Sequence, residues 1–201
     1  MRCLRFAQIF AFPITLTIGI LLIPVVTDYD DHDLAARAAS STFRWVAGHL
    51  LSAAAFGLGV HAATLILTEL RESGYQLPAI IDLFLAFGAG LFAAGLGIDG
   101  IGPVIMAASG APTSTFFDAS GWWVSGIFAA ATALFGMGLI SLTIHTNRAG
   151  LVAGPWRYVI FISSLFFVTA PIIPSGWALY GLALAATGIF IPIGIAILKG
   201  K

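Results

Sequence analysis

Six apolar runs, each about as long as a membrane-crossing helix, restrict what this sequence can fold into. They cover residues 6–27, 43–68, 79–107, 121–145, 157–174 and 176–198. A helix of roughly 20 apolar residues spans the hydrocarbon core of a bilayer. Because lipid offers no partner to unpaired backbone groups, each run is expected to be a helix. We therefore predict an all-α polytopic membrane bundle of six transmembrane helices, forming a single domain over residues 1–201.

The composition agrees with a membrane protein. Only 9% of the 201 residues are charged and 59% are hydrophobic, whereas soluble domains carry about 25% charged residues. The formal net charge is zero, which leaves no basic surface for nucleic acid. The single cysteine, Cys3, cannot form an internal disulfide or a cysteine metal site. The first run resembles a signal peptide, but its apolar part is too long, so we expect it to remain as the first membrane helix.

Lysine and arginine residues gather on one side of the six predicted spans. Arg37 and Arg44 are the exceptions, and the side that carries the termini holds Arg2, Arg5, Arg71, Arg148, Arg157, Lys199 and Lys201. Cytoplasmic loops are rich in basic residues. The sequence therefore predicts a multi-pass protein of the cell membrane with both termini cytoplasmic and the acidic loop 28–41 outside.

Two features of the span pattern leave alternatives open. The fifth run is short and contains Pro171, so it is either a full crossing or a kinked or re-entrant segment. Residues 45–48 (WVAG) resemble 123–126 (WVSG), and 56–59 (FGLG) resemble 135–138 (FGMG). These similarities predict that helices 2–3 and 4–5 form a parallel repeat. Chance similarity in a sequence rich in glycine, alanine and phenylalanine is the other explanation.

Asp99 and His49 are the ionisable residues most deeply placed in the predicted spans. Asp99 lies among four glycines in the third span, roughly 12 Å from its outer end, and His49 lies at a similar depth in the second span. Buried charges in a membrane are costly, and a His–Asp pair reduces that cost. We expect the two side chains to lie close together and to form a ligand or proton site. A structural hydrogen bond between helices is the alternative, as is a helix that ends near Gly97.

Three other residues are weaker site candidates. His61 lies about 120° around the helix from His49, so the two do not share a face. A b-type haem would need an axial pair such as His61 and His145, and the sequence does not favour it; the cofactor stays unknown. Asp82 follows Pro78 in a first helical turn, where an acid commonly stabilises the helix start.

The outer loop contains the densest polar cluster in the chain. Asp28, Asp30, Asp31, His32 and Asp33 supply oxygen and nitrogen atoms that could hold a metal ion such as calcium. The glycine and glutamate of an EF-hand are missing from the pattern. A solvated loop that begins a short helix, 34–39, is the alternative interpretation.

The chain also resembles a class of uncharacterised six-helix bacterial integral membrane proteins. Pro24 at the end of the first span, Gly48-His49-Leu50 in the second span and the Gly97–Pro103 segment (GIDGIGP) in the third carry this resemblance. It implies a six-helix protein of the bacterial inner membrane and transfers no activity.

Three functions are consistent with the sequence. The first is a non-catalytic membrane protein that binds lipid or another hydrophobic small molecule, or that serves as an accessory subunit. The small-residue stripe Ala86-Gly90-Ala94 suits packing against a partner or within a homo-oligomer. The second is a small proton-linked transporter or channel that uses Asp99 and His49. The third is an intramembrane enzyme with the same two residues as its acid and base. An enzyme is the weakest of the three, because no nucleophile or metal motif accompanies the pair.

Overall fold

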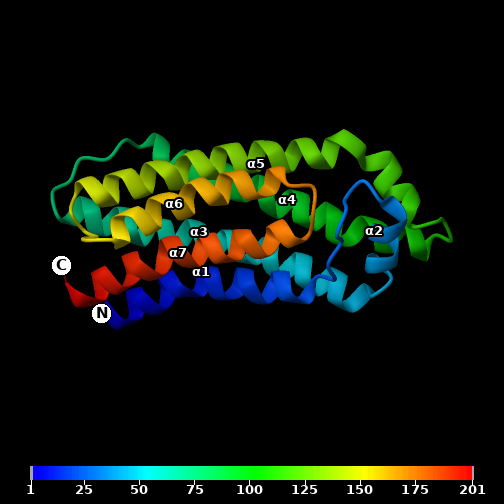
Figure 1. The fold of residues 1–201 in the computed structure, drawn as a ribbon, viewed down its shortest axis with the longest axis horizontal. Helices are drawn as coiled ribbons and strands as arrows, with labels where there is room; N and C mark the ends of the chain where they lie inside the picture. The colour runs from blue at the N-terminus through cyan, green and yellow to red at the C-terminus, as the bar shows by residue number, and fades with distance from the viewer. Residues whose placement is uncertain (1, 201) are drawn as a thin grey trace.

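The computed structural model describes residues 2–200, and every regular element in this range is a helix (Figure 1). In chain order these are α1 (Arg2–Leu22), α2 (His32–Ala39), α3 (Thr42–Glu72), α4 (Ile80–Ala108), α5 (Ser114–Arg148), α6 (Trp156–Thr169), the 3₁₀ turn η1 (Ala170–Ile172) and α7 (Trp177–Lys199). The predicted helix bundle is confirmed. Five helices, namely α1, α3, α4, α7 and the Trp122–Arg148 part of α5, are long and apolar enough to cross a membrane. The chain is therefore a multi-pass membrane protein.

Two helix boundaries differ from the expected ones for physical reasons. α1 ends at Leu22 and not near residue 27, because Pro24 lacks an amide hydrogen and disfavours helical geometry in the residue before it. α5 begins at Ser114 and not near residue 121, so Asp118 belongs to a helix and not to a loop. The short helix α2 begins where Asp31 accepts a hydrogen bond from the amide of Leu34.

The long helices form a closed antiparallel ring. Each helix from α3 to α7 packs on the one before it in the order α1, α3, α4, α5, α6, α7, and α7 returns to α1 (Figure 1). Glycines allow the closest approaches: a Cβ added to Gly88 of α4 would collide with the backbone of Phe135 on α5. A Cβ added to Gly48 of α3 would lie 2.9 Å from the carbonyl oxygen of Gly19 on α1. Small residues thus set the spacing of neighbouring helices, as in other membrane bundles.

The centre of the ring is filled by six buried phenylalanines, one from each of the six ring helices. The stacked pair Phe56 and Phe92 has ring centroids 4.1 Å apart, and Phe12 contacts Phe190 edge-on at 5.0 Å. All six side chains are almost completely buried: Phe12, Phe56, Phe92, Phe135, Phe167 and Phe190. We call this set the phenylalanine layer. It leaves the middle of the bundle packed with aromatic carbon.

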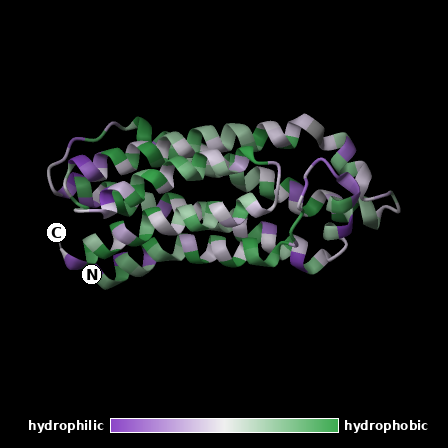
Figure 2. Ribbon diagram, in the orientation of Figure 1, coloured by the Kyte–Doolittle hydropathy of each residue, from purple (hydrophilic) through white to green (hydrophobic). Residues whose placement is uncertain are grey.

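The end of the ring that lies away from the two termini, which we call the outer end, is stepped (Figure 1). α6 and α7 stop at the turn before Trp177, while α3, α4 and α5 continue past it and meet α2 (Figure 1). A second small core forms there from Ile23, Val26, Ala35, Ala39 and Trp45. Hydrophobic residues run along the middle of the bundle, and hydrophilic residues gather at its two ends (Figure 2). We call the projecting part, made of α2 and the adjoining ends of α3, α4 and α5, the outer cap.

The fifth predicted span is the shortest helix of the ring. α6 ends at Thr169, and η1 with Pro171 extends the apolar segment only to Ile172. α6 nevertheless runs beside α7, where Gly181 lies against Phe166. The parallel repeat stays a prediction, since α5 has 35 residues and α6 has 14, whereas α3 and α4 have 31 and 29.

Candidate functional site

His49 and Asp99 contact one another across the α3–α4 interface, as expected. Nε2 of His49 lies 3.1 Å from Oδ2 of Asp99. The imidazole is buried, with 4% of its side chain exposed, and the carboxylate is 23% exposed. α4 can approach this closely because residue 100 is glycine: an added Cβ would lie 2.6 Å from the Cβ of His49. The glycines therefore permit a close helix contact.

The helix is not broken at this site. α4 continues through Gly97 and Pro103 to Ala108, so the alternative in which Asp99 belongs to the outer loop is wrong. Pro103 has no amide hydrogen to donate to the carbonyl oxygen four residues earlier, which belongs to Asp99. The indole Nε1–H of Trp45 donates to that oxygen at 2.9 Å. Pro103 of α4 thus leaves the carbonyl oxygen of Asp99 free to accept the hydrogen bond from Trp45 of α3.

The hydrogen bonds of His49 determine how many protons the pair holds. Its Nδ1 lies 2.7 Å from the carbonyl oxygen of Trp45. A carbonyl oxygen only accepts, so Nδ1 carries a hydrogen. The contact from Nε2 to Asp99 then needs one further proton, carried either by Nε2 or by the carboxyl group. In both cases the pair is neutral overall, and one exchangeable proton lies between Nε2 and the carboxyl group.

The site lies level with the outer end of α1. Gly48, beside His49, packs on Ile23, and the Nε–H of Arg44 donates to the carbonyl oxygen of Leu22, the last residue of α1. The pair therefore lies at the level where α1 ends, next to the outer cap. The reason is that α3 and α4 extend beyond α1 into the outer cap.

Tyr29 in the outer loop belongs to the electrostatic environment of the site. Burial raises the pKa of its phenol above the ordinary value, and the Asp99 carboxylate raises it further. Counted over the whole residue, 42% of Tyr29 remains exposed, so it lies at the edge of the site. The amide of Tyr29 donates to the carbonyl oxygen of Pro174 at 3.2 Å, so the turn before α7 holds this loop in place. Tyr29 was not among the predicted site residues, because it lies far from both partners along the chain.

The weaker candidates lie in separate environments. Asp82 pairs with Arg71 across the turn between α3 and α4, at 2.5 Å. His61 is exposed on the outer surface of α3. His145 packs edge-on against Tyr75 near the end of α5, with ring centroids 5.7 Å apart.

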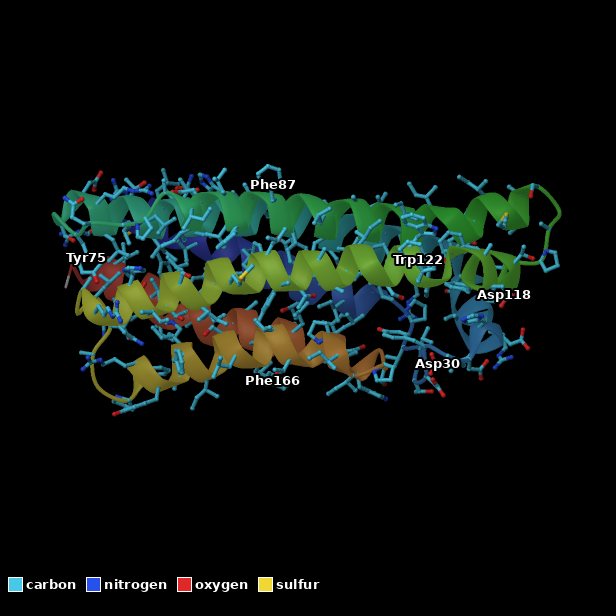
Figure 3. All side chains as sticks on the ribbon, turned by 90° about the horizontal axis from the view of Figure 1, so that it is seen from above. Asp30, Tyr75, Phe87, Asp118, Trp122 and Phe166 are labelled. Atoms are coloured by element: carbon cyan, nitrogen blue, oxygen red, sulfur yellow. The ribbon has the colours of Figure 1, made fainter. Side chains whose placement is uncertain are left out.

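The acidic loop does not assemble the predicted metal site. Within residues 2–200, no three or more histidine, cysteine, aspartate or glutamate side chains gather closely enough to hold a metal ion. Asp28 accepts from the amide of Asp30, Asp31 caps α2, and His32 contacts Asp118 of α5 at 2.6 Å. Figure 3 shows Asp30 and Asp118 together at the outer end, with Tyr75 at the opposite end. These side chains hold the outer cap in place.

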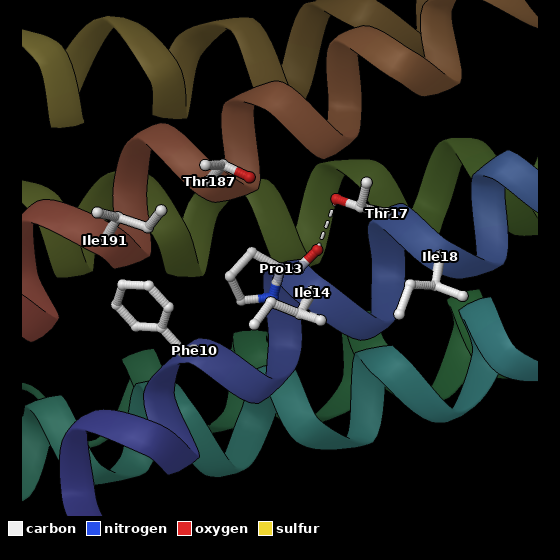
Figure 4. A pocket seen from close by; sticks show the side chains of 7 residues that line it. All are labelled: Phe10, Pro13, Ile14, Thr17, Ile18, Thr187 and Ile191. Carbon is white, nitrogen blue, oxygen red and sulfur yellow. Dashed lines mark hydrogen bonds between the residues drawn. The ribbon is translucent and has the colours of Figure 1, made fainter. Parts of the chain in front are cut away.

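Two apolar grooves lie on the exposed sides of the bundle, and the sequence predicted neither of them, although the second overlaps the small-residue stripe of α4. The first lies between α1 and α7 and has a volume of about 260 Å³. Its walls include Pro13, Ile14 and Thr187 (Figure 4). The second, of about 280 Å³, lies on α4 beside Gly90 and Phe87, within the small-residue stripe. Phe87 projects outward from the bundle (Figure 3).

Comparison with known proteins identifies no relative of this chain. No protein-family model matches the chain, and no curated protein and no solved structure matches it.

Proposed function

We propose that this chain is a non-catalytic integral membrane protein that binds a lipid or another hydrophobic small molecule, or that serves as an accessory subunit of a larger membrane complex. The phenylalanine layer is the observation that carries the proposal. Every ring helix places a buried phenylalanine at the centre of the bundle. A ligand or partner is therefore expected to bind on the exposed sides of the helices. That surface offers two apolar grooves and exposed apolar side chains such as Phe87 and Ile105 of α4.

A proton-linked transporter or channel is the second candidate, favoured by the exchangeable proton between His49 and Asp99. This proton lies at the outer end of the bundle. The phenylalanine layer stands between it and the end that carries the termini, so transport would require that layer to open. A packed aromatic layer of this kind favours a static role.

An intramembrane enzyme is less well supported by the geometry. A His–carboxylate pair is suited to acid–base chemistry. Both ring nitrogens of His49 are occupied here, by Trp45 and by Asp99. Neither nitrogen can take a proton from a substrate while these contacts persist.

Native mass spectrometry of the protein, extracted gently from its source membrane, tests the proposal. We expect the 21.0 kDa chain to carry a defined small adduct or to co-migrate with other polypeptides. A bare monomer or dimer that moves protons in liposomes, and stops when Asp99→Asn is introduced, would instead establish the transporter. The matched control is Asp118→Asn, which alters the carboxylate of the exposed His32 contact in the outer cap.

A further inference from the structure

We propose that the groove between α1 and α7 binds one acyl chain of an anionic phospholipid, whose phosphate lies at Arg2 and Lys199. This inference deepens the proposed function and rests on its lipid-binding form. The lipid would lie in the leaflet on the side of the termini, and Arg2 and Lys199 would select its headgroup.

The chemistry of the groove favours a hydrocarbon ligand. The hydroxyl of Thr17 donates to the carbonyl oxygen of Pro13 at 2.7 Å, as Figure 4 shows. The hydroxyl of Thr187 donates to the carbonyl oxygen of Ala183 at 2.9 Å. With both hydroxyls engaged by their own helices, the walls present carbon from Ile14, Thr17, Thr187 and Pro13. A polar small molecule would lose hydrogen bonds with water there without replacement, whereas an acyl chain has no such hydrogen bonds to lose.

The groove begins where the close packing of α1 and α7 ends. Nearer the termini, Gly194 of α7 lies against Phe6, Ile9 and Phe10 of α1, and an added Cβ would be 3.4 Å from each of them. Phe10 forms the end of the groove on that side, and Pro13 lies one turn further along α1. Proline in a helix interior removes a hydrogen bond and bends the helix. We attribute the opening between the helices to this change at Pro13.

The helix register connects the groove to the end of the bundle. Arg2, Phe6 and Phe10 follow one another at four-residue intervals, so they lie along one face of α1. The rise from Arg2 to Phe10 is about 12 Å. One leaflet of a bilayer contributes about 15 Å of hydrocarbon, half of the full core. An acyl chain whose headgroup lies at Arg2 is therefore long enough to pass Phe6 and enter the groove beyond Phe10.

The charges at this end favour an anionic headgroup. Arg5 contacts Glu69 at 2.5 Å and Glu72 at 3.1 Å, so these acids already have a basic partner. Within residues 2–200, Arg2 and Lys199 form no ion pair. The guanidinium of Arg2 lies against Gly200, so this charge stands at the junction of α1 and α7, beside the end of α7 that carries Lys199. Uncompensated basic residues at a membrane surface attract anionic lipid.

A lipid titration of the full-length protein, stripped of lipid in detergent and followed by native mass spectrometry, tests this site. Dioleoylphosphatidylglycerol and dioleoylphosphatidylcholine are compared because their acyl chains are identical. We expect a one-to-one phosphatidylglycerol adduct at concentrations where phosphatidylcholine gives none. The double variant Arg2→Gln/Lys199→Gln should lose about fivefold in affinity for each charge removed.

Two further variants locate the site. Arg148→Gln removes an exposed charge from the end of α5, away from the α1–α7 junction, and should leave the adduct unchanged. Ile14→Trp should fill the groove and abolish the adduct; because 52% of Ile14 is exposed, the fold should tolerate the larger side chain. The melting temperature of each variant is measured in parallel, and a variant that melts early is replaced by Ile14→Phe or by the single charge substitutions.

Three results would overturn the inference: equal binding of the two lipids by the natural sequence, undiminished phosphatidylglycerol binding by the double variant, or an adduct that survives Ile14→Trp. If any of these occurs while the protein from its source membrane still carries another small molecule or a polypeptide, the proposed function stands and only this site is lost. If that preparation is bare and active in transport, the proposed function fails as well.

Discussion

Asp99 joins α4 to α3 through two different atoms, its side-chain carboxylate and its backbone carbonyl oxygen. The carboxylate contacts His49, and the carbonyl oxygen accepts from Trp45. Pro103 frees the second acceptor, and Gly100 gives the imidazole its space. Three residues within about one turn of α4, namely Asp99, Gly100 and Pro103, therefore account for the polar contact between α3 and α4.

Asp99→Ala tests the stabilising role of the side-chain contact. It leaves Nε2 of a buried histidine without a partner and should cost about 1–3 kcal/mol in the free energy of unfolding. Asp99→Asn should recover most of this loss, because the amide can donate to Nε2 without an exchangeable proton. Asp118→Ala is the matched control, since 63% of its side chain is exposed and it should cost about 0–1 kcal/mol. Thermal unfolding in detergent measures all three, and equal losses for Asp99→Ala and Asp118→Ala would contradict this assignment.

Tyr29 should make stability depend on alkaline pH. Its phenol has a raised pKa in the folded state because of burial and Asp99. The folded protein thus retains a proton that the unfolded chain releases above about pH 10, and the associated stability falls as the pH rises beyond that value. The melting temperature of Tyr29→Phe should decline less steeply over the same range. Parallel curves for the two proteins would show that the phenol does not contribute.

At the scale of elements, glycine sets which helices touch. Gly19 and Gly48 bring α1 against α3, Gly88 brings α4 against α5, and Gly100 brings α4 against α3. Other glycines have open space around them, including Gly90 and Gly97. Sequence spacing does not distinguish these two groups, because both occur at helical intervals in the same apolar run.

A pair of alanine substitutions in α4 tests this distinction. In Gly100→Ala the new Cβ lies 2.6 Å from the Cβ of His49, which must force α3 and α4 apart. Overpacking of this kind should cost about 1–3 kcal/mol. In Gly97→Ala the new Cβ has no atom within 4 Å, so the higher helix propensity of alanine should leave stability unchanged or raise it by up to ~1 kcal/mol. The melting temperatures of the two variants in detergent are compared. If Gly97→Ala melts at a lower temperature than Gly100→Ala, the close contact assigned to Gly100 is contradicted.

At the scale of the whole molecule, the ring has an aromatic interior and an uneven outer end. The three helices of 29 to 35 residues are consecutive in the ring, so α3, α4 and α5 project together past the shorter α6 and α7. A helix of 30 residues is about 45 Å long, which exceeds the ~30 Å hydrocarbon core. The projecting ends pack with α2, and this places the His49–Asp99 pair at the boundary between the ring and the outer cap.

Cysteine labelling tests the number of crossings and their direction. Cys3, the single cysteine of the sequence, is exposed. In a Cys3→Ser background, Asp30→Cys and Pro174→Cys should react with an impermeant maleimide on intact cells. The natural Cys3 should react only after the membrane is opened. Protection of Pro174→Cys in intact cells would show that α6 does not cross the bilayer.

The sequence by itself determined that the chain is a helical membrane protein and where most of its helices lie. Apolar runs of membrane length have few alternatives once backbone groups must be satisfied within each segment. The proximity of His49 and Asp99 was also predictable, because their depths match on neighbouring antiparallel helices. Tertiary structure decided how far α3 and α4 extend beyond α1, and hence that the pair lies beside the outer cap. It also decided that the acidic loop caps α2 and contacts α5, that six phenylalanines from six helices converge, and that a groove opens beside Pro13. These features depend on contacts between distant segments, whose geometry the packing of side chains determines and the order of residues along one helix does not.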